Sequence, residues 1–285
     1  MSPGAAEGGS VSRPGVGGSA ADASSLPGAS VLVTGGTRGI GRAIALRLVA
    51  DGAARAVLGY MRNDKAAEEA AALVQEAGAE PVLVRGNVAD ERVVAELGAA
   101  GPYRVVVHNA ATGVIRAALE TEDKHWDWTL NANARALLSL ARVTAPEMEE
   151  GGSIVAISSL GSQRVLPNYV LIGTSKAALE AVVRYLGFDL APRGIRVNCV
   201  SAGVVDTEAL DWFPNKEQML ATVKRTPAGR LVAPEDVAAA VLVAARSEET
   251  GQAWAVQPGR EPLRFRFPNL PGPRVEGAEG TLPPL

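Results

Sequence analysis

The sequence has little of what disulfides, metal sites and polyanion binding require. Its single cysteine, Cys199, excludes an intrachain disulfide and a cysteine-rich zinc cluster, and it indicates a reducing compartment, so we expect a cytoplasmic protein. The two histidines, His108 and His125, have no third ligand near them, so no metal site is predicted. A formal net charge of −3 gives no electrostatic reason to expect nucleic acid or an anionic membrane as a partner.

Long apolar runs are also missing. The chain has no run of about 18 uncharged apolar residues that could cross a membrane, and its start lacks the charged and apolar regions of a secretory signal. Aromatic residues make up only 4% of the chain, although apolar residues make up 47%. This composition is typical of a soluble globular protein with one large core.

Three segments differ in composition. Residues 1–28 contain seven glycines among Ser, Ala and Pro without apolar periodicity, which predicts a disordered leader. Residues 29–258 carry the periodic apolar patterns of one folded domain. Residues 259–285 are rich in proline and predict an extended tail, in which Leu263, Phe265 and Phe267 alternate like an edge strand that docks on a neighbour.

In the folded part, short Val/Ile/Leu runs alternate with longer helical patterns, which predicts an α/β fold: a doubly wound parallel sheet with helices on both faces. Strands are expected at Ser30–Thr34, Arg55–Tyr60, Pro81–Asn87, Val105–His108, Ser153–Ser158, Ile195–Ser201 and Trp254–Gln257. Helices are expected at Gly39–Asp51, Lys65–Gly78, Asp90–Ala99, His125–Glu149, Tyr169–Ala191, Lys216–Lys224 and Pro234–Ala245.

The first expected strand runs directly into a glycine-rich turn and then an apolar helix. The turn comprises Gly35, Gly36, Thr37, Arg38, Gly39, Ile40 and Gly41. Such a turn lets the backbone approach a pyrophosphate, whose charge is met by the helix N-terminus, as in Rossmann-type folds. The alternative is a tight strand-to-helix turn without a ligand. The position between strand and helix favours dinucleotide binding.

Charges near the adenosine ribose indicate which dinucleotide is bound. The second expected strand ends at Tyr60 and Arg62 with no acid that would accept from the ribose hydroxyls of NADH. Arg38 lies in the glycine turn, so two arginines can converge on a 2′-phosphate. Either arginine alone would be an ordinary surface charge. Together with the missing acid, they predict NADPH as the cofactor.

The spacing of Gly35, Gly39 and Gly41 forms a TGxxxGxG pattern, in which the chain resembles the short-chain dehydrogenases/reductases. The resemblance covers about residues 31–257. It implies further cofactor contacts at Asn87, Val88, Asn109, Ala110, Gly203, Val205 and Thr207. The chain departs from the family at His108, where the family has asparagine, and at Gln257-Pro258-Gly259, where the family commonly has Asp-Gly-Gly.

The family's usual Tyr-x3-Lys motif is absent, because Ile172 stands four residues before Lys176. Tyr169 stands seven residues before the lysine, and this Tyr-x6-Lys spacing resembles that of the enoyl-thioester reductases. On a helix both positions face the lysine, but the earlier one lies about 4.5 Å farther along the axis. In a conjugate reduction hydride goes to the β-carbon and negative charge develops on the thioester oxygen two carbons away. A phenol placed farther along the helix is better positioned to stabilise the negative charge on that oxygen.

The resemblance assigns roles to three other residues. Lys176 is expected to hold the nicotinamide ribose and, as a nearby cation, to favour the phenolate or an acidic phenol of Tyr169. Ser159 falls at the catalytic serine position, where it either donates to the substrate carbonyl or is retained from ketoreductase ancestry. Asn133 aligns with a helix asparagine that carries a water-linked proton path to the lysine, although Asn131 competes for this role and a helix-bending role is the alternative.

Residues 158–230 resemble enoyl-acyl-carrier-protein reductase, particularly its NADPH-dependent type III form. This implies reduction of an enoyl thioester on acyl carrier protein or CoA, in fatty-acid, polyketide, antibiotic or other specialised biosynthesis. It also implies a homotetramer built on the helices at 125–149 and 169–191. Trp212 and Phe213 either form an apolar substrate flap or pack in the core.

Two other functions remain open. One is a 3-ketoacyl or polyketide ketoreductase of the same family, in which Tyr169 serves despite its displacement. The other is an NADPH-binding partner subunit without chemistry of its own. The joint presence of Tyr169, Lys176, Ser159 and Asn133 argues against the second, because a subunit without catalysis has no physical need for the set.

Overall fold

The computed structural model describes residues 26–208, 210, 216–223, 229–256, 258 and 262–265. Trp212 and Phe213 of the expected flap lie outside the described residues, as do Gln257, Gly259 and most of the expected leader and tail. Among the helices that the structure describes, none combines the length and apolar character needed to cross a membrane.

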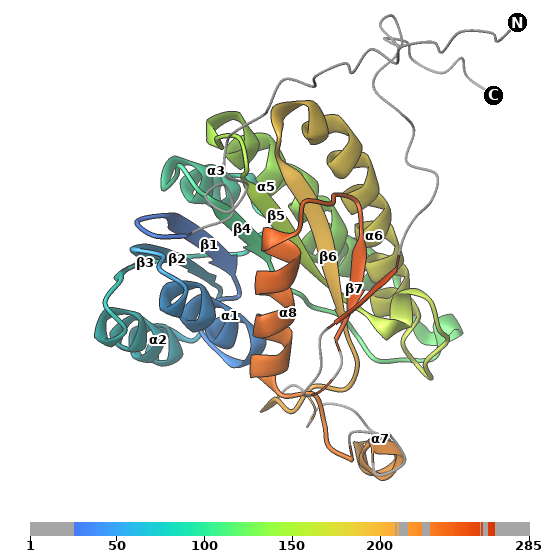
Figure 1. Ribbon diagram of the computed structural model, residues 1–285. Coiled ribbons are helices and arrows are strands. Elements are labelled where there is room, and N and C mark those ends of the chain that lie inside the picture. The colour runs from blue at the N-terminus through green and yellow to red at the C-terminus, as the bar shows by residue number, and fades with distance from the viewer. Residues whose placement is uncertain are drawn as a thin grey trace, which may run out of the picture.

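One eight-stranded sheet forms the centre of the fold (Figure 1). Its strands are β1 (Ser30–Thr34), β2 (Arg55–Tyr60), β3 (Glu80–Arg85), β4 (Val105–His108), β5 (Ser153–Ser159), β6 (Arg196–Ala202), β7 (Ala253–Ala255) and β8 (Leu263–Phe265). They are ordered β3-β2-β1-β4-β5-β6-β7-β8, and every neighbouring pair is parallel except β7 and β8. The order reverses between β1 and β4, so the predicted doubly wound sheet is confirmed.

Helices cover both faces of the sheet. They are α1 (Gly39–Ala50), α2 (Asp64–Glu76), α3 (Glu91–Ala99), α4 (Asp123–Leu130), α5 (Ala136–Thr144), α6 (Val170–Leu190), α7 (Lys216–Val223) and α8 (Pro234–Arg246). Helices α1, α2 and α8 share one hydrophobic core with the sheet, and α3, α5 and α6 share another on the opposite face (Figure 1). Helix α7 stands apart from both layers, beyond the edge of the sheet at which β6 ends.

The strand sequences explain this layering. In β1, Val31 and Val33 belong to the core on the α1 face, whereas Leu32 belongs to the core on the α5 face. All three are fully buried, as the continuous apolar run predicted. Helix α2 begins at a side-chain cap, because Asn63 accepts from the backbone amide of Ala66.

The single helix predicted at 125–149 is divided in the structure. It starts earlier, at Asp123, because the Nδ1 atom of His125 accepts from the backbone amide of Glu122 at 3.2 Å. A π-helical turn, Asn131–Arg135, then separates α4 from α5. Helix α5 ends at Thr144, and a short 3₁₀ turn containing Pro146 follows it.

Both ends of the folded domain extend beyond the expected boundaries. Leu26, placed by its sequence in the leader, is buried in the core on the α1 face. Residues 263–265, placed in the tail, form β8, which pairs with β7 of the same chain rather than with a neighbour. Strand β3 ends at Arg85 instead of Asn87, because Gly86 adopts a positive φ of 157° and turns the chain away.

Candidate active site

Most residues selected from the sequence lie at the carboxyl edge of the sheet, at the ends of β1 to β6 or in the turns that follow them, whereas Asn133 lies in the π turn and Lys176 on α6. This edge, at the point where the strand order reverses, is where doubly wound sheets bind their ligands. It has an adenosine half around β1, β2 and β3 and a chemical half around β5, β6 and α6.

The glycine turn is a cradle of backbone that connects β1 to α1 and is closely packed on itself. Gly35 and Gly39 have positive φ angles of 63° and 49°, a conformation that favours glycine. A Cβ on Gly41 would collide with the carbonyl oxygen of Gly35 and lie 2.6 Å from Nδ2 of Asn109. The N-terminus of α1 has no side-chain cap and no acid in its first turn. The turn therefore fits the pyrophosphate of a dinucleotide, which the helix N-terminus would bind.

Asn109 and Thr34 hold this cradle in place. The Nδ2 atom of Asn109 donates to the carbonyl oxygens of Thr34 at 3.1 Å and Gly35 at 3.0 Å. The hydroxyl oxygen of Thr34 accepts from the backbone amides of Asn109 and Ala110, both at 3.1 Å. Asn109 and Ala110 thus position the loop, and their expected contact with the cofactor stays a prediction.

Exposed charges surround the place expected for the adenosine ribose. Arg62 is exposed, and Arg38 forms an ion pair with Glu208 at 3.6 Å, in which both side chains are largely exposed. Exposed pairs of this kind are weak, so Arg38 can exchange Glu208 for a phosphate at little cost. Tyr60 donates to Asp64 at 3.0 Å, and Arg85 lies 3.4 Å from the same carboxylate.

Asp64 and Arg85 were not identified from the sequence. Asp64 follows the second strand by four residues, in the first turn of α2, and its carboxylate is engaged by Tyr60 and Arg85. Arg85 reaches it because β2 and β3 pair in a register that sets Tyr60 opposite Arg85. This proximity depends on the sheet register, and no local sequence pattern contains it.

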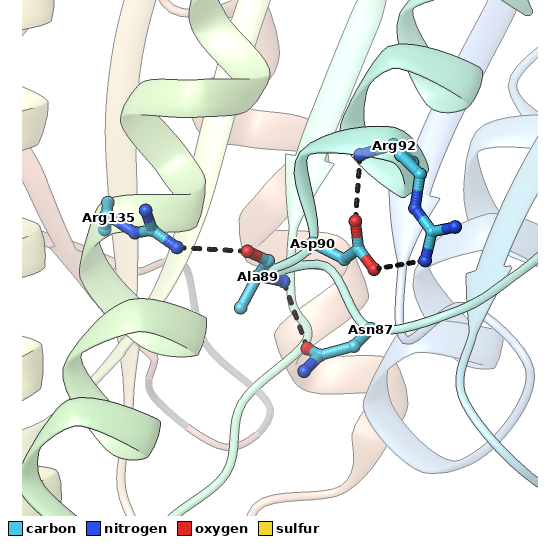
Figure 2. A network of polar contacts seen from close by, with 5 residues as sticks. All are labelled: Asn87, Ala89, Asp90, Arg92 and Arg135. Atoms are coloured by element: carbon cyan, nitrogen blue, oxygen red, sulfur yellow. Dashed lines mark hydrogen bonds and ion pairs between the residues drawn. The ribbon is translucent and has the colours of Figure 1, made fainter.

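The turn after β3, which carries Asn87 and Val88, is held by a polar network (Figure 2). The Oδ1 atom of Asn87 accepts from the amide of Ala89 at 3.0 Å. Arg135 points across from the π turn and donates to the carbonyl oxygen of Ala89 at 3.0 Å. Asp90 caps α3 and binds Arg92. Arg135, missed in the sequence, thus ties the expected adenine turn to the helix that carries Asn133.

The turn after β6 meets the glycine turn. Val205 forms a parallel bridge with Val232, and the amide of Asp206 donates to the Val232 carbonyl at 2.9 Å. The Cγ2 atom of Thr207 lies 3.5 Å from where a Cβ on Gly39 would stand. The structure therefore brings Thr207 beside the glycine turn, and the expected contact of Gly203, Val205 and Thr207 with the nicotinamide stays a prediction.

In the chemical half, Tyr169 stands at the N-terminus of α6 and not within it. Its φ and ψ angles of −110° and 13° are non-helical, and Asn168 before it has a positive φ of 60°. The expectation that Tyr169 lies within the helix, seven residues before Lys176, is therefore wrong: Tyr169 precedes the first helical residue. The backbone of Asn168 is held by Arg116, whose amide donates to its carbonyl at 2.9 Å.

Glycines fix the ring of Tyr169. A Cβ on Gly161 would lie 2.5 Å from Cε1 of the ring, and a Cβ on Gly173 would lie 3.6 Å from its Cδ1. The ring therefore lies against Gly161, where only glycine leaves room. The phenol donates to the hydroxyl oxygen of Ser159 at 3.5 Å, the outer limit of a hydrogen bond. The structure thus brings Tyr169 and Ser159 together.

Burial raises the pKa of Tyr169, and the hydrogen bond with Ser159 acts in the opposite direction. The expectation that Lys176 makes this phenol more acidic is therefore not met. A protonated phenol at neutral pH is suited to donate a hydrogen bond. Ile172, at the position where the family has its tyrosine, packs its side chain against Gly113.

Lys176 is buried, and its Nζ donates to the carbonyl oxygen of Ile157 at 2.7 Å. Burial lowers its pKa to about 8, whereas Cys199 and Glu180 act to raise it. The thiol of Cys199 is buried as well, which raises its own pKa and keeps it neutral at neutral pH. Glu180 is therefore the anion that supports the Lys176 cation.

Asn133 is fully buried in the π turn, and both polar atoms of its side-chain amide form hydrogen bonds. Its Nδ2 donates to the carbonyl of Thr112 at 2.8 Å and to the hydroxyl of Ser175 at 2.9 Å, and its Oδ1 accepts from the amide of Thr112 at 2.8 Å. It therefore reaches the residue before Lys176. Its other role as a helix-bending residue is compatible with the π turn, and the proton path stays a prediction.

His108 links the two halves. A carbonyl oxygen can only accept, so its Nε2 donates to the carbonyl of Asn133 at 3.1 Å, which leaves Nδ1 to accept from the hydroxyl of Thr34 at 3.3 Å. Burial, reinforced by Lys176, lowers the pKa of His108 to about 4, so the ring is neutral at pH 7. The departure from the family's asparagine is thus a buried connection between β1 and the π turn.

Comparisons with known proteins identify the family to which the chain is similar. The family described as Enoyl-(Acyl carrier protein) reductase matches residues 35–259. The chain is 34% identical over 239 residues to a 1-cyclohexenylcarbonyl-CoA reductase of Streptomyces collinus, covering 80% of this chain and 85% of the relative.

Solved structures are similar over the same region. A short chain dehydrogenase of Burkholderia cenocepacia J2315 in complex with NADP has a TM-score of 0.74 and 31% identity, covering 82% of this chain and 98% of that one. The reductase LugOII, which catalyses keto-reduction at C1 during lugdunomycin biosynthesis, has a TM-score of 0.73 and 32% identity, covering 81% and 96%. The similar proteins thus include a thioester reductase and a ketone reductase.

Proposed function

We propose that this chain, which belongs to the short-chain dehydrogenase/reductase family of oxidoreductases, is an NADPH-dependent enoyl-thioester reductase. The observation that carries the proposal is the position of the phenol. Tyr169 lies beside Ser159 at the N-terminus of α6, and the position four residues before Lys176 is filled by Ile172 packed on Gly113. The acid is therefore displaced from where a ketone reductase of this family holds it.

NADPH, when bound, supplies the hydride that adds to the β-carbon of the enoyl thioester. Gly35, Gly39 and Gly41 would hold its pyrophosphate at α1, and Lys176 would hold its nicotinamide ribose. Tyr169 donates a hydrogen bond to the thioester oxygen as negative charge develops there, which stabilises the enolate. A proton then adds to the α-carbon to complete the saturated acyl group.

The surroundings of Tyr169 suit an acyl chain. Leu160, Leu166 and Val170 are each more than a third exposed although they are large and apolar. A Cβ on Gly161 would lie 3.4 Å from Leu166, so this surface adjoins the phenol. Apolar side chains beside one polar group are typical of a small-molecule site. An acyl group carried by CoA or acyl carrier protein is the substrate that we infer, in fatty-acid or specialised biosynthesis.

NADPH is the cofactor that we propose, because the arginines of the adenosine half are exposed to an incoming phosphate. Arg38 pairs with Glu208 in an exposed, weak ion pair, and Arg62 is exposed two residues after the end of β2. The carboxylate of Asp64 is engaged by Arg85 and Tyr60, which reduces its ability to accept from a ribose.

A cytoplasmic homotetramer is part of the proposal. Trp126 and Trp128 on α4 and Tyr185 on α6 are exposed aromatic residues on the two helices expected to pair between subunits. Exposed apolar surface of this kind is typical of subunit contacts. Sedimentation equilibrium tests the assembly directly.

Ketone reduction is the second candidate, favoured by the Ser159 hydroxyl beside the phenol. The test follows NADPH oxidation with crotonyl-CoA, an N-acetylcysteamine enoyl thioester and the matching 3-ketoacyl thioesters. Turnover of the enoyl compounds supports the proposal. Turnover of the ketoacyl compounds alone contradicts it in favour of a ketoreductase. NADPH binding without turnover of any of them favours a partner subunit.

A further inference from the structure

Glu180 is a buried carboxylate that the proposed mechanism does not use. It lies on α6 one helical turn after Lys176, and only 4% of it is exposed. A carboxylate in such a position needs hydrogen bonds or a cation to offset its lost hydration. Its neighbours show what it holds.

Three side chains donate to Glu180, and all come from the segment that carries Ser159. The hydroxyls of Ser158 and Ser162 lie 2.6 Å from its Oε1 atom, and the amide of Gln163 lies 3.4 Å from its Oε2 atom. The segment 158–163 leaves β5 and forms the turn against which the Tyr169 ring packs. Glu180 therefore fastens this turn to α6.

Ser162 makes the connection direct. Its hydroxyl has one proton and two acceptors, the carboxylate of Glu180 and the carbonyl oxygen of Ser159 at 2.8 Å. The hydroxyl of Ser159 in turn accepts from the amide of Gly161 at 3.2 Å. A change at Glu180 thus reaches the backbone of Ser159 through one side chain.

Glu180 lies one helical turn after Lys176 on α6, and its charge acts to raise the pKa of that lysine. The other titratable groups around this lysine are His108 on β4, Cys199 on β6 and Tyr169 at the start of α6, and all three are neutral at neutral pH. Arg184, one turn beyond Glu180, acts on Cys199 and adds no negative charge. The Nζ of Lys176 itself is bound to a neutral carbonyl. A buried cation requires such a counter-charge to stay protonated.

We infer that Glu180 is a positioning residue, whose carboxylate fastens the Ser159 turn to α6 and keeps the ammonium of Lys176 charged. The inference rests on the proposed function for the roles of Ser159 and Lys176. Its geometry is independent of the substrate. Its test therefore needs no turnover.

The first measurement is the titration of Lys176 by NMR with side-chain-labelled lysine. The chain has only five lysines, and Lys176→Arg identifies the buried one. The pKa of Lys176 is about 8 in the unchanged protein. Glu180→Gln keeps the shape but removes the charge, and we expect it to lower the pKa of Lys176 by about 1 unit. Glu180→Asp keeps the charge, so the pKa of Lys176 in this variant should stay close to its value in the unchanged protein.

The second measurement is hydrogen exchange over residues 158–163. Glu180→Gln and Ser162→Ala should each accelerate exchange there, and Ser162→Ala should leave the Lys176 titration unchanged. Asp189→Asn removes an exposed acid from the same helix and is the matched control, which should change neither readout. If Glu180→Gln does not fold, the hydrogen exchange of residues 158–163 in Ser162→Ala tests the inference instead.

An unchanged Lys176 titration in folded Glu180→Gln overturns the inference, and so does unchanged exchange at 158–163 in Ser162→Ala. Both readouts use the protein without substrate. A chain that fails to reduce enoyl thioesters but shows both effects contradicts the proposed function and leaves the positioning role of Glu180 intact.

Discussion

The adenosine half and the chemical half of the carboxyl edge are built differently. Around β1, β2 and β3 the charged side chains are exposed and pair weakly, as Arg38 in the turn after β1 does with Glu208. Around α6 the polar groups are buried and bound to one another: Lys176 is 5% exposed, Glu180 4% and Asn133 0%. Exposed charges can select a cofactor without affecting the fold, whereas buried groups fix a geometry on which both stability and chemistry depend. Substitutions should therefore act differently in the two halves.

The largest effect is expected at Tyr169. Tyr169→Phe removes the hydroxyl that faces the developing charge and keeps the ring against Gly161. Enoyl turnover should fall by about 10²- to 10⁴-fold, while NADPH binding is retained. Steady-state kinetics and fluorescence titration with NADPH measure the two quantities. Tyr185→Phe on α6 is the control, because it removes an exposed hydroxyl but keeps the aromatic ring of the proposed subunit contact, and it should leave turnover unchanged.

Substitution of Asn133 should lower the stability of the protein. Asn133→Ala removes the partner of the half-buried amide and carbonyl of Thr112 and the donor to the buried Ser175 hydroxyl. We expect a loss of about 1–3 kcal/mol in the free energy of unfolding, measured with urea. Asn131→Ala, in the same π turn, serves as the comparison. An equal loss in both variants would contradict the preference for Asn133.

The pH dependence of NADPH affinity and enoyl turnover should reflect the protonation of Lys176 in the chemical half. Lys176 holds the ribose as a cation, and its pKa is about 8, below the ordinary value of lysine. The charged form is present below this pKa and is lost as the pH rises through it. NADPH affinity and enoyl turnover should therefore fall as the pH rises from about 7 to about 9. A pH profile that is flat across this range would contradict the cationic role.

Cofactor preference should respond to the adenosine half. Arg38→Ala and Arg62→Ala each remove a cation that would face the 2′-phosphate. Because both arginines are exposed, we expect each to lower the preference for NADPH over NADH by only about tenfold, and less at high salt. Unfolding by urea should be unchanged. A preference that stays the same in the double variant would point to Arg85 as the phosphate ligand.

The smallest effect is expected at Arg135, which connects the two halves. Its guanidinium donates to the Ala89 carbonyl in the turn expected to bind adenine (Figure 2). Arg135→Met keeps the aliphatic side chain and removes this bond. The Kd for NADPH should rise a few-fold, in line with one exposed hydrogen bond of about 1 kcal/mol. Turnover at saturating NADPH should not change.

Local patterns predicted the fold and part of the site. The alternating strands and helices and the glycine turn were predicted because each depends on a continuous stretch of chain. The π turn was missed because Asn131–Arg135 forms no pattern of its own and is bound through His108, Ser175 and the turn after β3.

Residues that act through distant partners could not be predicted. Arg85 meets Asp64 only through the register of β2 and β3, and Glu180 meets Ser158 only where α6 crosses β5. The motif spacing identified Tyr169, but its non-helical backbone follows from the left-handed Asn168 before it. The spacing alone gave no indication of that conformation.

Competition between two substrates tests the central claim most directly. The purified protein receives NADPH with equal amounts of an enoyl thioester and a 3-ketoacyl thioester of the same chain length, and the products are identified by mass spectrometry. The displaced phenol predicts that the saturated acyl thioester predominates and that Tyr169→Phe abolishes it. Predominance of the 3-hydroxyacyl thioester would contradict the account.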